Sequence, residues 1–291
     1  MGKCLHITSG DIAGAAIAQC TLPGELLVWH DILYDGPREP GWPTATVLAA
    51  RAVFIEGHTG GGLDRREVLK TLQDQYARLR AVGRDETIVL WVDACLFDQS
   101  MLCHLLVCLQ HLALNRVELL CVDRFPGIVP YHGLGQLTSA QLASVYDRRR
   151  AIMPEQSRFA REVDSAFARQ DRNMFRELAA LADAPLPWVP AAAARWLEER
   201  PDAQTGLGRL ARMALDAIRT GSRVPGDIFR AAAAAETPPQ YWGDTTLWAE
   251  INALADRQPP LVRIEGPARR LPQWPGGMRL EHFRVYPMNL P

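Results

Sequence analysis

Short apolar runs alternate with longer helical patterns in the first part of the chain. The runs have strand length and are bounded by turn-forming residues at 3–8, 25–29, 87–92 and 117–122. Residues 12–20, 65–82 and 101–114 have the composition or spacing of helices. Strands that alternate with helix-length segments are typical of a parallel α/β unit. We therefore predict an α/β fold with a doubly wound, mostly parallel sheet.

The pattern changes at residue 138. The segment Thr138-Ser139-Ala140-Gln141 has the spacing of a capping box, in which the side chain of the first residue accepts a hydrogen bond from a free backbone N–H group. Residues 140–182 are charged and helical in pattern, and the Pro-containing stretch at 184–187 separates them from another helix at 191–199. We expect residues 138–200 to be a helical connector.

The last part of the chain has a third pattern. Three helical segments lie at 207–220, 225–235 and 245–256, and strand-like runs at 261–264 and 279–286 follow around a Pro/Gly-rich loop. Three helices followed by a β-hairpin is the order of a winged helix. The sequence therefore predicts three parts, which are an α/β ligand-binding domain at 1–137, the connector at 138–200, and a winged-helix-like domain at 201–291.

Composition excludes several classes of protein. Hydrophobic residues make up 48% and charged residues 22% of the chain, as in folded globular proteins. The formal net charge of −1 provides no overall field that would attract nucleic acid or an anionic membrane. No apolar run reaches the roughly 20 residues of a membrane span. The six cysteines form no CxxC pair and have apolar neighbours, so we expect reduced thiols and a cytoplasmic location.

Several motifs occur in an order that resembles the DUF1835 family of bacterial proteins. They are His6-Ile7-Thr8-Ser9-Gly10-Asp11, Leu27 to Leu33 with Gly36-Pro37, Leu90-Trp91 with Phe97-Asp98-Gln99 and Leu102, and Gly133 to Thr138. The last third, including Gly243-Asp244-Thr245 and Trp248, resembles the companion region of that family. The chain departs from the family pattern at Ser9, where Asn is usual, and at Asp93-Ala94-Cys95, where a Glu-His-Asp-like run is common. The resemblance implies an α/β fold and brings no activity with it.

The end of the first predicted strand is the first candidate site. Thr8, Ser9 and Gly10 precede a helix, and N–H groups at a helix N-terminus favour an anion such as phosphate. An ordinary turn is the alternative for Thr8 and Ser9. Asp11 is either a helix cap or a catalytic or metal-binding group. His6, inside the strand, is either a buried structural histidine or a catalytic acid or base.

Two further carboxylates follow the second predicted strand. Asp31 and Asp35 could join Asp11 as hard oxygen ligands for Mg²⁺, which would bridge to a substrate phosphate, and Asp31 is also a candidate catalytic acid or base. Turn capping is the alternative for each of them. Arg51 and the run Arg148-Arg149-Arg150 are candidates to neutralise phosphate, with a solvated helix face as the alternative for the run.

The third predicted strand end contributes Asp93, Asp98 and Gln99. Because carboxyl ends of parallel strands meet at one edge, we expect Asp98 as a catalytic group and Gln99 as a ligand-binding group there. Solvated loop acids are the alternative. Trp29 and Trp91 either form walls of the pocket or belong to the core. The glycine-rich stretch at 57–62 lacks the Lys-Ser/Thr ending of a P-loop and is expected to be a flexible loop or lid.

The third helix of the C-terminal part is poorly suited to reading DNA. Residues 245–256 contain two acids and one Asn but no basic side chain. The following segment carries more positive charge, through Arg263, Arg269, Arg270, Arg279 and Arg284. We therefore favour a protein-interaction or lid role for this domain over nucleic-acid binding.

Two functional hypotheses follow from these patterns. The first is binding, with or without processing, of a phosphorylated or nucleotide-like small molecule at the carboxyl rim of the sheet, with Mg²⁺ as candidate cofactor. The second is a regulatory or scaffold protein whose winged helix binds a protein partner or, with less support, DNA. Neither hypothesis involves a membrane.

Overall fold

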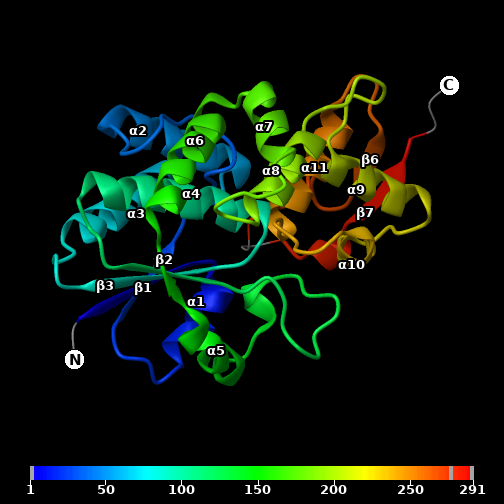
Figure 1. Cartoon of the computed structure of the whole chain (residues 1–291). Helices are drawn as coiled ribbons and strands as arrows, with labels where there is room; N and C mark the ends of the chain where they lie inside the picture. Colours follow the sequence, from blue (N-terminus) through cyan, green and yellow to red (C-terminus); the bar gives the residue numbers. More distant parts are fainter. Residues whose placement is uncertain (1–2, 275–277, 289–291) are drawn as a thin grey trace.

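A five-stranded sheet in the order β2-β1-β3-β4-β5 forms the centre of the N-terminal domain (Figure 1). The strands are β1 Cys4–Ser9, β2 Glu25–Trp29, β3 Thr87–Val92, β4 Val117–Cys121 and β5 Arg150–Ala151. The first four are parallel, and β5 is antiparallel to β4. This computed structural model describes residues 3–274 and 278–288. Residues 275–277, part of the predicted Pro/Gly-rich loop, lie outside the described residues. The predicted α/β class and mostly parallel sheet are confirmed.

Four helices connect the parallel strands. They are α1 Asp11–Ala18, α2 Ala45–His58, α3 Arg65–Arg80 and α4 Leu96–His111. The sequence analysis missed α2, whose buried positions Leu48, Arg51, Ala52 and Ile55 have helical spacing but include a charged residue. It also predicted that α4 begins at residue 101, whereas the helix begins at Leu96. Cys95 caps this helix, because its side chain accepts a hydrogen bond from the N–H of Asp98.

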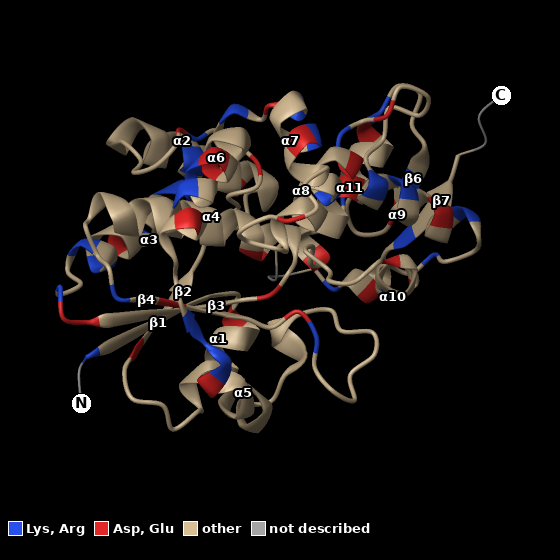
Figure 2. Cartoon of the chain, in the orientation of Figure 1, with Lys and Arg blue, Asp and Glu red and all other residues tan. Residues whose placement is uncertain are grey.

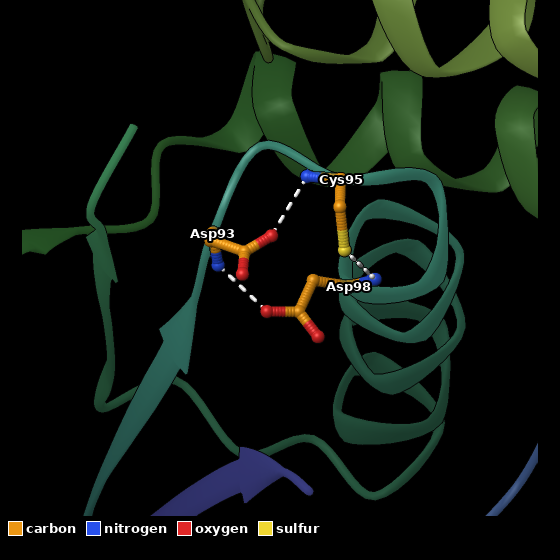
Figure 3. Close-up of side chains that lie close together, drawn as sticks. All are labelled: Asp93, Cys95 and Asp98. Atoms are coloured by element: carbon orange, nitrogen blue, oxygen red, sulfur yellow. Dashed lines mark hydrogen bonds between the residues drawn. The ribbon is translucent and has the colours of Figure 1, made fainter. Parts of the chain in front are cut away.

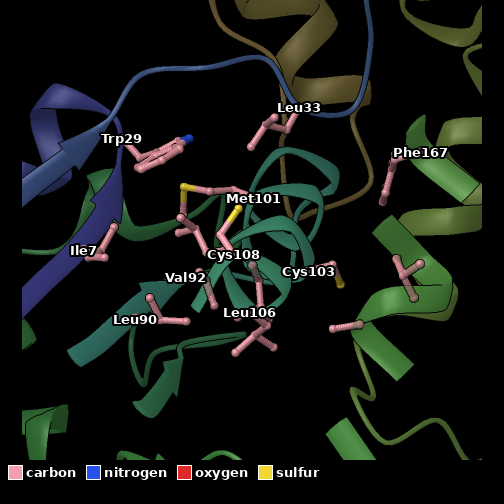
Figure 4. Close-up of a cluster of buried hydrophobic side chains, with 14 of the residues drawn as sticks. Ile7, Trp29, Leu33, Leu90, Val92, Met101, Cys103, Leu106, Cys108 and Phe167 are labelled. Carbon is pink, nitrogen blue, oxygen red and sulfur yellow. The ribbon is translucent and has the colours of Figure 1, made fainter. Parts of the chain in front are cut away.

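Each face of the sheet is covered by helices. Alternate residues of β1 point to opposite faces, so Leu5 and Ile7 lie in one hydrophobic cluster while His6 and Thr8 face the other way. The first face packs on α2, α3 and α4, and its core includes Trp29, Leu90 and Phe167 (Figure 4). The opposite face, with Trp91, packs on α1 and on α5, whose bounds are Ser139–Val145.

The segment expected as a connector packs on the sheet domain. Its remaining helices are α6 Pro154–Arg169, α7 Arg172–Ala179 and α8 Val189–Glu198. The predicted capping box at Thr138 is present. Phe159 and Val163 of α6 and Trp196 of α8 belong to the same hydrophobic cluster as α4. The helices α6 to α8 therefore complete the layer on the face of the sheet that α4 covers, whereas α5 lies on the opposite face. Residues 138–200 also supply β5, which the sequence analysis did not predict.

The C-terminal domain has a core of its own. It consists of α9 Arg209–Arg219, α10 Pro225–Ala235, α11 Asp244–Asp256, β6 Val262–Glu265 and β7 Arg284–Pro287. The two strands pair in antiparallel orientation, and a separate hydrophobic cluster runs from Leu207 to Val285. Three helices followed by a two-stranded antiparallel sheet is the predicted order of elements.

The two domains touch along several segments. The side-chain amide of Gln273 donates to the carbonyl oxygen of His58 at 2.7 Å, and the N–H of Gln240 donates to the carbonyl of His132 at 3.2 Å. Arg195 of α8 forms a buried ion pair with Glu236, which follows α10. The C-terminal domain therefore lies against the carboxyl edge of the sheet. Among the described residues, no helix combines the length and the apolar character that a membrane crossing requires.

Candidate functional site at the interdomain cleft

The strand order creates a switch point beside β1. The chain passes from β1 to β2 on one side, and then returns to β3 on the other side of β1. The loops that leave the carboxyl ends of β1 and β3 therefore diverge, and ligands of open α/β sheets bind in such a crevice. Ser9 and Gly10 follow β1 here, and Asp93 follows β3.

Two adjoining cavities open at this edge. The one directly above β1 and β3 has a volume of about 440 Å³, and the larger one, of about 510 Å³, extends between α2, α3 and the start of α11. Asp11, Phe97, Tyr241 and Gly243 line both cavities, so the two form one cleft between the domains. A cleft of this size matches the usual range for small-molecule sites.

The two ends of the cleft differ in chemistry. The larger cavity is mainly apolar and includes Tyr34, Phe97 and Trp274, whereas the smaller one contains Asp93, Asp98 and the Gly-rich turn at 133–135. None of the described residues that line either cavity is a Lys or an Arg. Asp93 and Asp98 therefore lie at the smaller cavity without an arginine or lysine among its described lining residues.

Asp93, Cys95 and Asp98 form the polar floor of the smaller cavity (Figure 3). The N–H of Asp93 donates to one oxygen of Asp98 at 2.7 Å, and the hydroxyl of Ser9 donates to the other. The N–H of Cys95 donates to Asp93 at 2.8 Å, and the N–H of Asp98 donates to the Cys95 sulfur at 3.4 Å. The end of β3 and the first turn of α4 therefore hold three donor groups together.

The electrostatics of this cluster disfavour charge on all three groups at once. Burial raises the pKa of Asp98 well above its usual value, and the charge of Asp93 adds to the increase. Burial also raises the pKa of Asp93, although hydrogen bonds from Cys95 and Leu134 oppose it. The pKa of the Cys95 thiol is raised by burial and then by the two carboxyl charges. Among the described residues, neither carboxylate has a cationic side chain as partner.

A loop from beyond β4 closes the cluster from another side. The N–H of Leu134 donates to Asp93 at 3.2 Å. Gly133 has a φ of 142°, and a side chain at this position would collide with the carboxylate of Asp93. Glycine is therefore required where the loop approaches the acid.

The N-terminus of α1 borders the same cavity. Gly10 precedes the helix with a φ of 71° and provides no side-chain cap, so the first N–H groups of the helix have no side-chain acceptor from that residue. Asp11 lies in the first turn with 82% of its side chain exposed, and its carboxylate contacts the ring Nε2 of His30 at 2.8 Å. Of the candidates predicted after β1, Ser9, Gly10 and Asp11 therefore reach the cleft.

Asp31 and Arg51 do not act as the sequence analysis expected. The Arg51 Nε donates to both oxygens of Asp31, at 2.8 and 3.0 Å, and both side chains are fully buried. The other donors of Arg51 bind the backbone carbonyls of Ile32, Asp35 and Pro37. Arg51 therefore has no donor left for phosphate. Asp31 lines the larger cavity, but both of its oxygens are paired with Arg51.

His6 lies away from the carboxyl edge. Its Nδ1 accepts a hydrogen bond from the indole N–H of Trp91 at 3.1 Å, which leaves Nε2 to donate to the carbonyl of Pro23 at 3.2 Å. Burial lowers the pKa of His6. The structure therefore places His6 as a neutral structural histidine, and the prediction of a catalytic role is not supported by its position.

The two predicted pocket walls and Thr8 also belong to the interior. Trp91 is fully buried and stacks on Tyr146, with ring centroids 5.6 Å apart. Trp29 is fully buried and meets Tyr76 edge to face. Thr8 is buried in β1, and its hydroxyl donates to the carbonyl of Ser9. None of the three is among the residues that line the cleft.

The remaining candidates divide between the cluster and the surface. Gln99 is buried beside the cluster, where its amide nitrogen donates to the carbonyl of Asp93 at 2.7 Å. Asp35 bonds to the N–H of Gly36 and to Gln170, so it does not join Asp11 and Asp31 in the expected Mg²⁺ site. Within the arginine run at 148–150, Arg149 pairs with Glu118 and Asp147, and Arg150 donates to the carbonyl of Asp147.

Sequence reasoning missed Cys95 and the residues of the C-terminal domain that line the cleft. Cys95 was interpreted as a small buried hydrophobe, although its position between two acids just past a strand was a usable signal. Tyr241 and Thr246 could not be found in this way, because their place opposite the sheet depends on how the domains pack.

A search among protein-family models found no match to this chain, and a search among curated proteins found none either. The resemblance to the DUF1835 family therefore rests on the quoted motifs. The function has to be argued from the geometry of the cleft.

Proposed function

We propose that this protein binds a phosphorylated or nucleotide-like small molecule in the cleft between its two domains. The observation that carries the proposal is the continuity of an apolar, aromatic-lined cavity with a polar cavity at the switch point of the sheet. Open α/β sheets bind their ligands at such switch points. A ligand with an apolar or planar part and a charged end matches both halves of the cleft.

The apolar half suits the planar part of the ligand. Tyr34, Phe97, Tyr241 and Trp274 line it, and aromatic side chains provide large contact areas with defined orientation. Thr246, from the start of α11, adds a hydroxyl on the side of the C-terminal domain. Binding would therefore contact both domains at once.

The polar half suits a phosphate only together with a cation. The N–H groups at the start of α1 favour an anion. Asp93 and Asp98 oppose one, and no Lys or Arg lines the cavity within the described part of the chain. A divalent cation between the carboxylates and the phosphate would resolve this conflict.

The test is a thermal-shift screen of nucleotides and sugar phosphates with EDTA, Mg²⁺ or Zn²⁺. A ligand at 100 times its dissociation constant adds about 2.7 kcal/mol to the free energy of unfolding. Thr71 lines the larger cavity from the exposed side of α3, so Thr71→Trp should block the shift. Lys70→Trp, a neighbour outside the lining, is the matched control and should keep it. The proposal fails if no compound shifts the midpoint, or if Thr71→Trp leaves a shift unchanged.

The regulatory alternative has less support from the geometry. Residues 243–246, at the start of α11, line the cleft, so this end of the helix faces the sheet domain and not a free surface. Positive and negative segments are interspersed over the C-terminal domain (Figure 2). Arg263, Arg270 and Arg279 each pair with a nearby acid. A winged helix that reads DNA with this helix is therefore not the function that we propose.

A further inference from the structure

Buried carboxylates in this protein fall into two kinds. Five acidic side chains are buried among the described residues, at Asp31, Asp93, Asp98, Asp164 and Glu236. Asp31 pairs with Arg51, Asp164 with Arg38, and Glu236 with Arg195. Asp93 and Asp98 have no such partner in the described part of the chain. Because a buried carboxylate is costly without a counter-charge, these two carboxyl groups point to a positive charge supplied from outside the chain.

The donor atoms around this position match a metal ion. One atom each from Asp93, Cys95 and Asp98 lies within 4.8 Å of the other two. Figure 3 shows the three side chains converging from the end of β3 and the start of α4. Zn²⁺ binds thiolate sulfur at about 2.3 Å and carboxylate oxygen at about 2.0–2.2 Å, so small rotations would bring these donors onto one ion. A thiolate among the donors favours Zn²⁺ over Mg²⁺.

A nearby hydroxyl is an independent sign of a missing partner. Tyr131 is only 6% exposed, and its hydroxyl has no hydrogen-bond partner among the described residues. Tyr131 directly precedes His132 and Gly133, which line the smaller cavity, and burial, followed by the charge of Asp93, raises the pKa of its hydroxyl. Buried hydroxyl groups are normally paired, and a water ligand of a bound ion would pair this one.

We propose that Asp93, Cys95 and Asp98 form a binding site for a divalent cation of the Zn²⁺ type at the floor of the cleft. The cation is bound by the Cys95 thiolate and one oxygen from each carboxylate. The protons displaced from these groups pass to solvent. Three protein ligands leave a further position, which faces the cavity and is filled by water or by a ligand oxygen.

The proposed cation also bears on how the cleft would bind a phosphate. It supplies the positive charge that a phosphate needs beside Asp93 and Asp98, and in this respect the inference rests on the proposed function. Binding of the cation alone does not depend on any small molecule. The two ideas can therefore fail separately.

Cobalt(II) is the probe for the test, because a thiolate bound to Co²⁺ gives a charge-transfer absorption in the near ultraviolet. The purified full-length chain is stripped with EDTA, freed of chelator and titrated with Co²⁺. We expect the absorption to saturate at stoichiometric cobalt and Zn²⁺ to abolish it. Cys95→Ser should remove it, whereas Cys121→Ser should retain it. Cys121 is the matched control, since the charges of Asp93 and Asp98 reach that thiol as well.

The inference is overturned if the unmodified chain shows no cobalt–thiolate absorption, or if Cys95→Ser retains it. Far-ultraviolet circular dichroism checks that each variant is folded. If Cys95→Ser does not fold, the readout is the Zn²⁺-induced rise in melting temperature, which Asp98→Asn should abolish and Cys121→Ser should keep. An unchanged rise in Asp98→Asn also overturns the inference. If cobalt does not bind while nucleotides still shift the midpoint in EDTA, only the cation site falls; if cobalt binds and no ligand does, only the proposed function falls.

Discussion

Two pairs of carboxylates, Asp31 with Asp164 in the helical layer and Asp93 with Asp98 at the rim of the sheet, are similarly buried. Their negative charge is neutralised in different ways. Asp31 and Asp164 each lie against a buried arginine that also donates to backbone carbonyls. Asp93 and Asp98 are held only by N–H and hydroxyl groups. In the first arrangement an arginine neutralises each carboxylate and stabilises the fold. In the second, no described cationic side chain neutralises the carboxylates, which lie beside a cavity. Unbalanced buried charge is therefore the feature that separates the candidate site from the scaffold.

The scaffold pair around Asp164 shows what a completed network does. Its oxygens accept bonds from Arg38, His104 and the N–H of Gly41. Burial alone would raise the pKa of Asp164, but the hydrogen bond and charge of His104 and the charge of Arg38 lower it overall. The network joins α6 to α4 and to the loop after β2. The charges of Arg38 and His104 therefore offset the free-energy cost of burying the Asp164 carboxylate, and the carboxylate does the same for them.

The largest expected effect comes from breaking such a pair. Arg51→Leu leaves Asp31 buried without its counter-charge and should lower the free energy of unfolding by about 3–5 kcal/mol. Urea denaturation measures the change. Arg65→Leu is the control, because Arg65 pairs with Glu56 at the surface with 62% of its side chain exposed. Its effect should stay below about 1 kcal/mol. Equal losses in both variants would contradict the role given to burial.

Glu250 and Glu199 form a third group of acids, at the domain interface. Arg200 is close to Glu250 but neutralises its charge only in part. Burial and then the charge of Glu199 raise the pKa of Glu250 to about 7, while Arg200 lowers it and Asp35 raises it. In the unfolded chain Glu250 loses its proton near the ordinary pKa of 4.5, whereas in the folded chain it keeps the proton up to about pH 7. The free energy of unfolding therefore falls as the pH rises from about 4.5 to about 7. With allowance for partial exposure, the loss should be about 1–2 kcal/mol.

Glu250→Gln tests this interface directly. The variant should lose part of the decrease in melting temperature between pH 5 and pH 8 because Gln does not titrate, and the raised pKa values of Asp93 and Asp98 should account for the remainder. A decrease as large as that of the unmodified chain would assign the pH dependence to other groups. Glu265→Gln, an exposed acid of β6, is a suitable control and should leave the pH profile unchanged.

A smaller effect of opposite sign is expected at the rim. Without metal, Asp98→Asn should raise the free energy of unfolding by roughly 1 kcal/mol, because a neutral amide replaces a buried acid that has no cationic partner. The amide oxygen can still accept from the N–H of Asp93, and the amide nitrogen can donate to Ser9. Asp164→Asn should instead destabilise the chain. Denaturation in EDTA compares the two, and destabilisation of similar size in both would remove the distinction between rim and scaffold.

The smallest effect is expected for the exposed acid of the cleft. Asp11→Asn should change the free energy of unfolding by less than about 0.5 kcal/mol, because the Asp11–His30 pair is open to solvent. Denaturation in low and high salt measures the change. A large loss of stability would mean that Asp11 holds the start of α1 in place, and that its position at the cleft is structural.

Local pattern was sufficient for most of the fold. The runs at 25–29 and 87–92 were predicted with the bounds that β2 and β3 have, because short apolar runs stand out between turns, although only β3 is buried on both faces. Helix α2 was missed because a core position holds Arg51, whose burial depends on Asp31. The same long-range pair explains why Arg51 has no donor left for a ligand, and why Asp31 lines the cleft with both of its oxygens already paired. Charge in the sequence does not show whether a partner from another element neutralises it.

The sequence by itself determined the α/β alternation, the capping box at Thr138 and the presence of acids after β1, β2 and β3, because these features depend on neighbours along the chain. Only the tertiary structure decided which acids are neutralised by arginine, which meet a thiol, and which face a cleft closed by the C-terminal domain. Those outcomes depend on electrostatic and packing contacts between segments far apart in sequence, and such contacts leave no periodic pattern in a single chain.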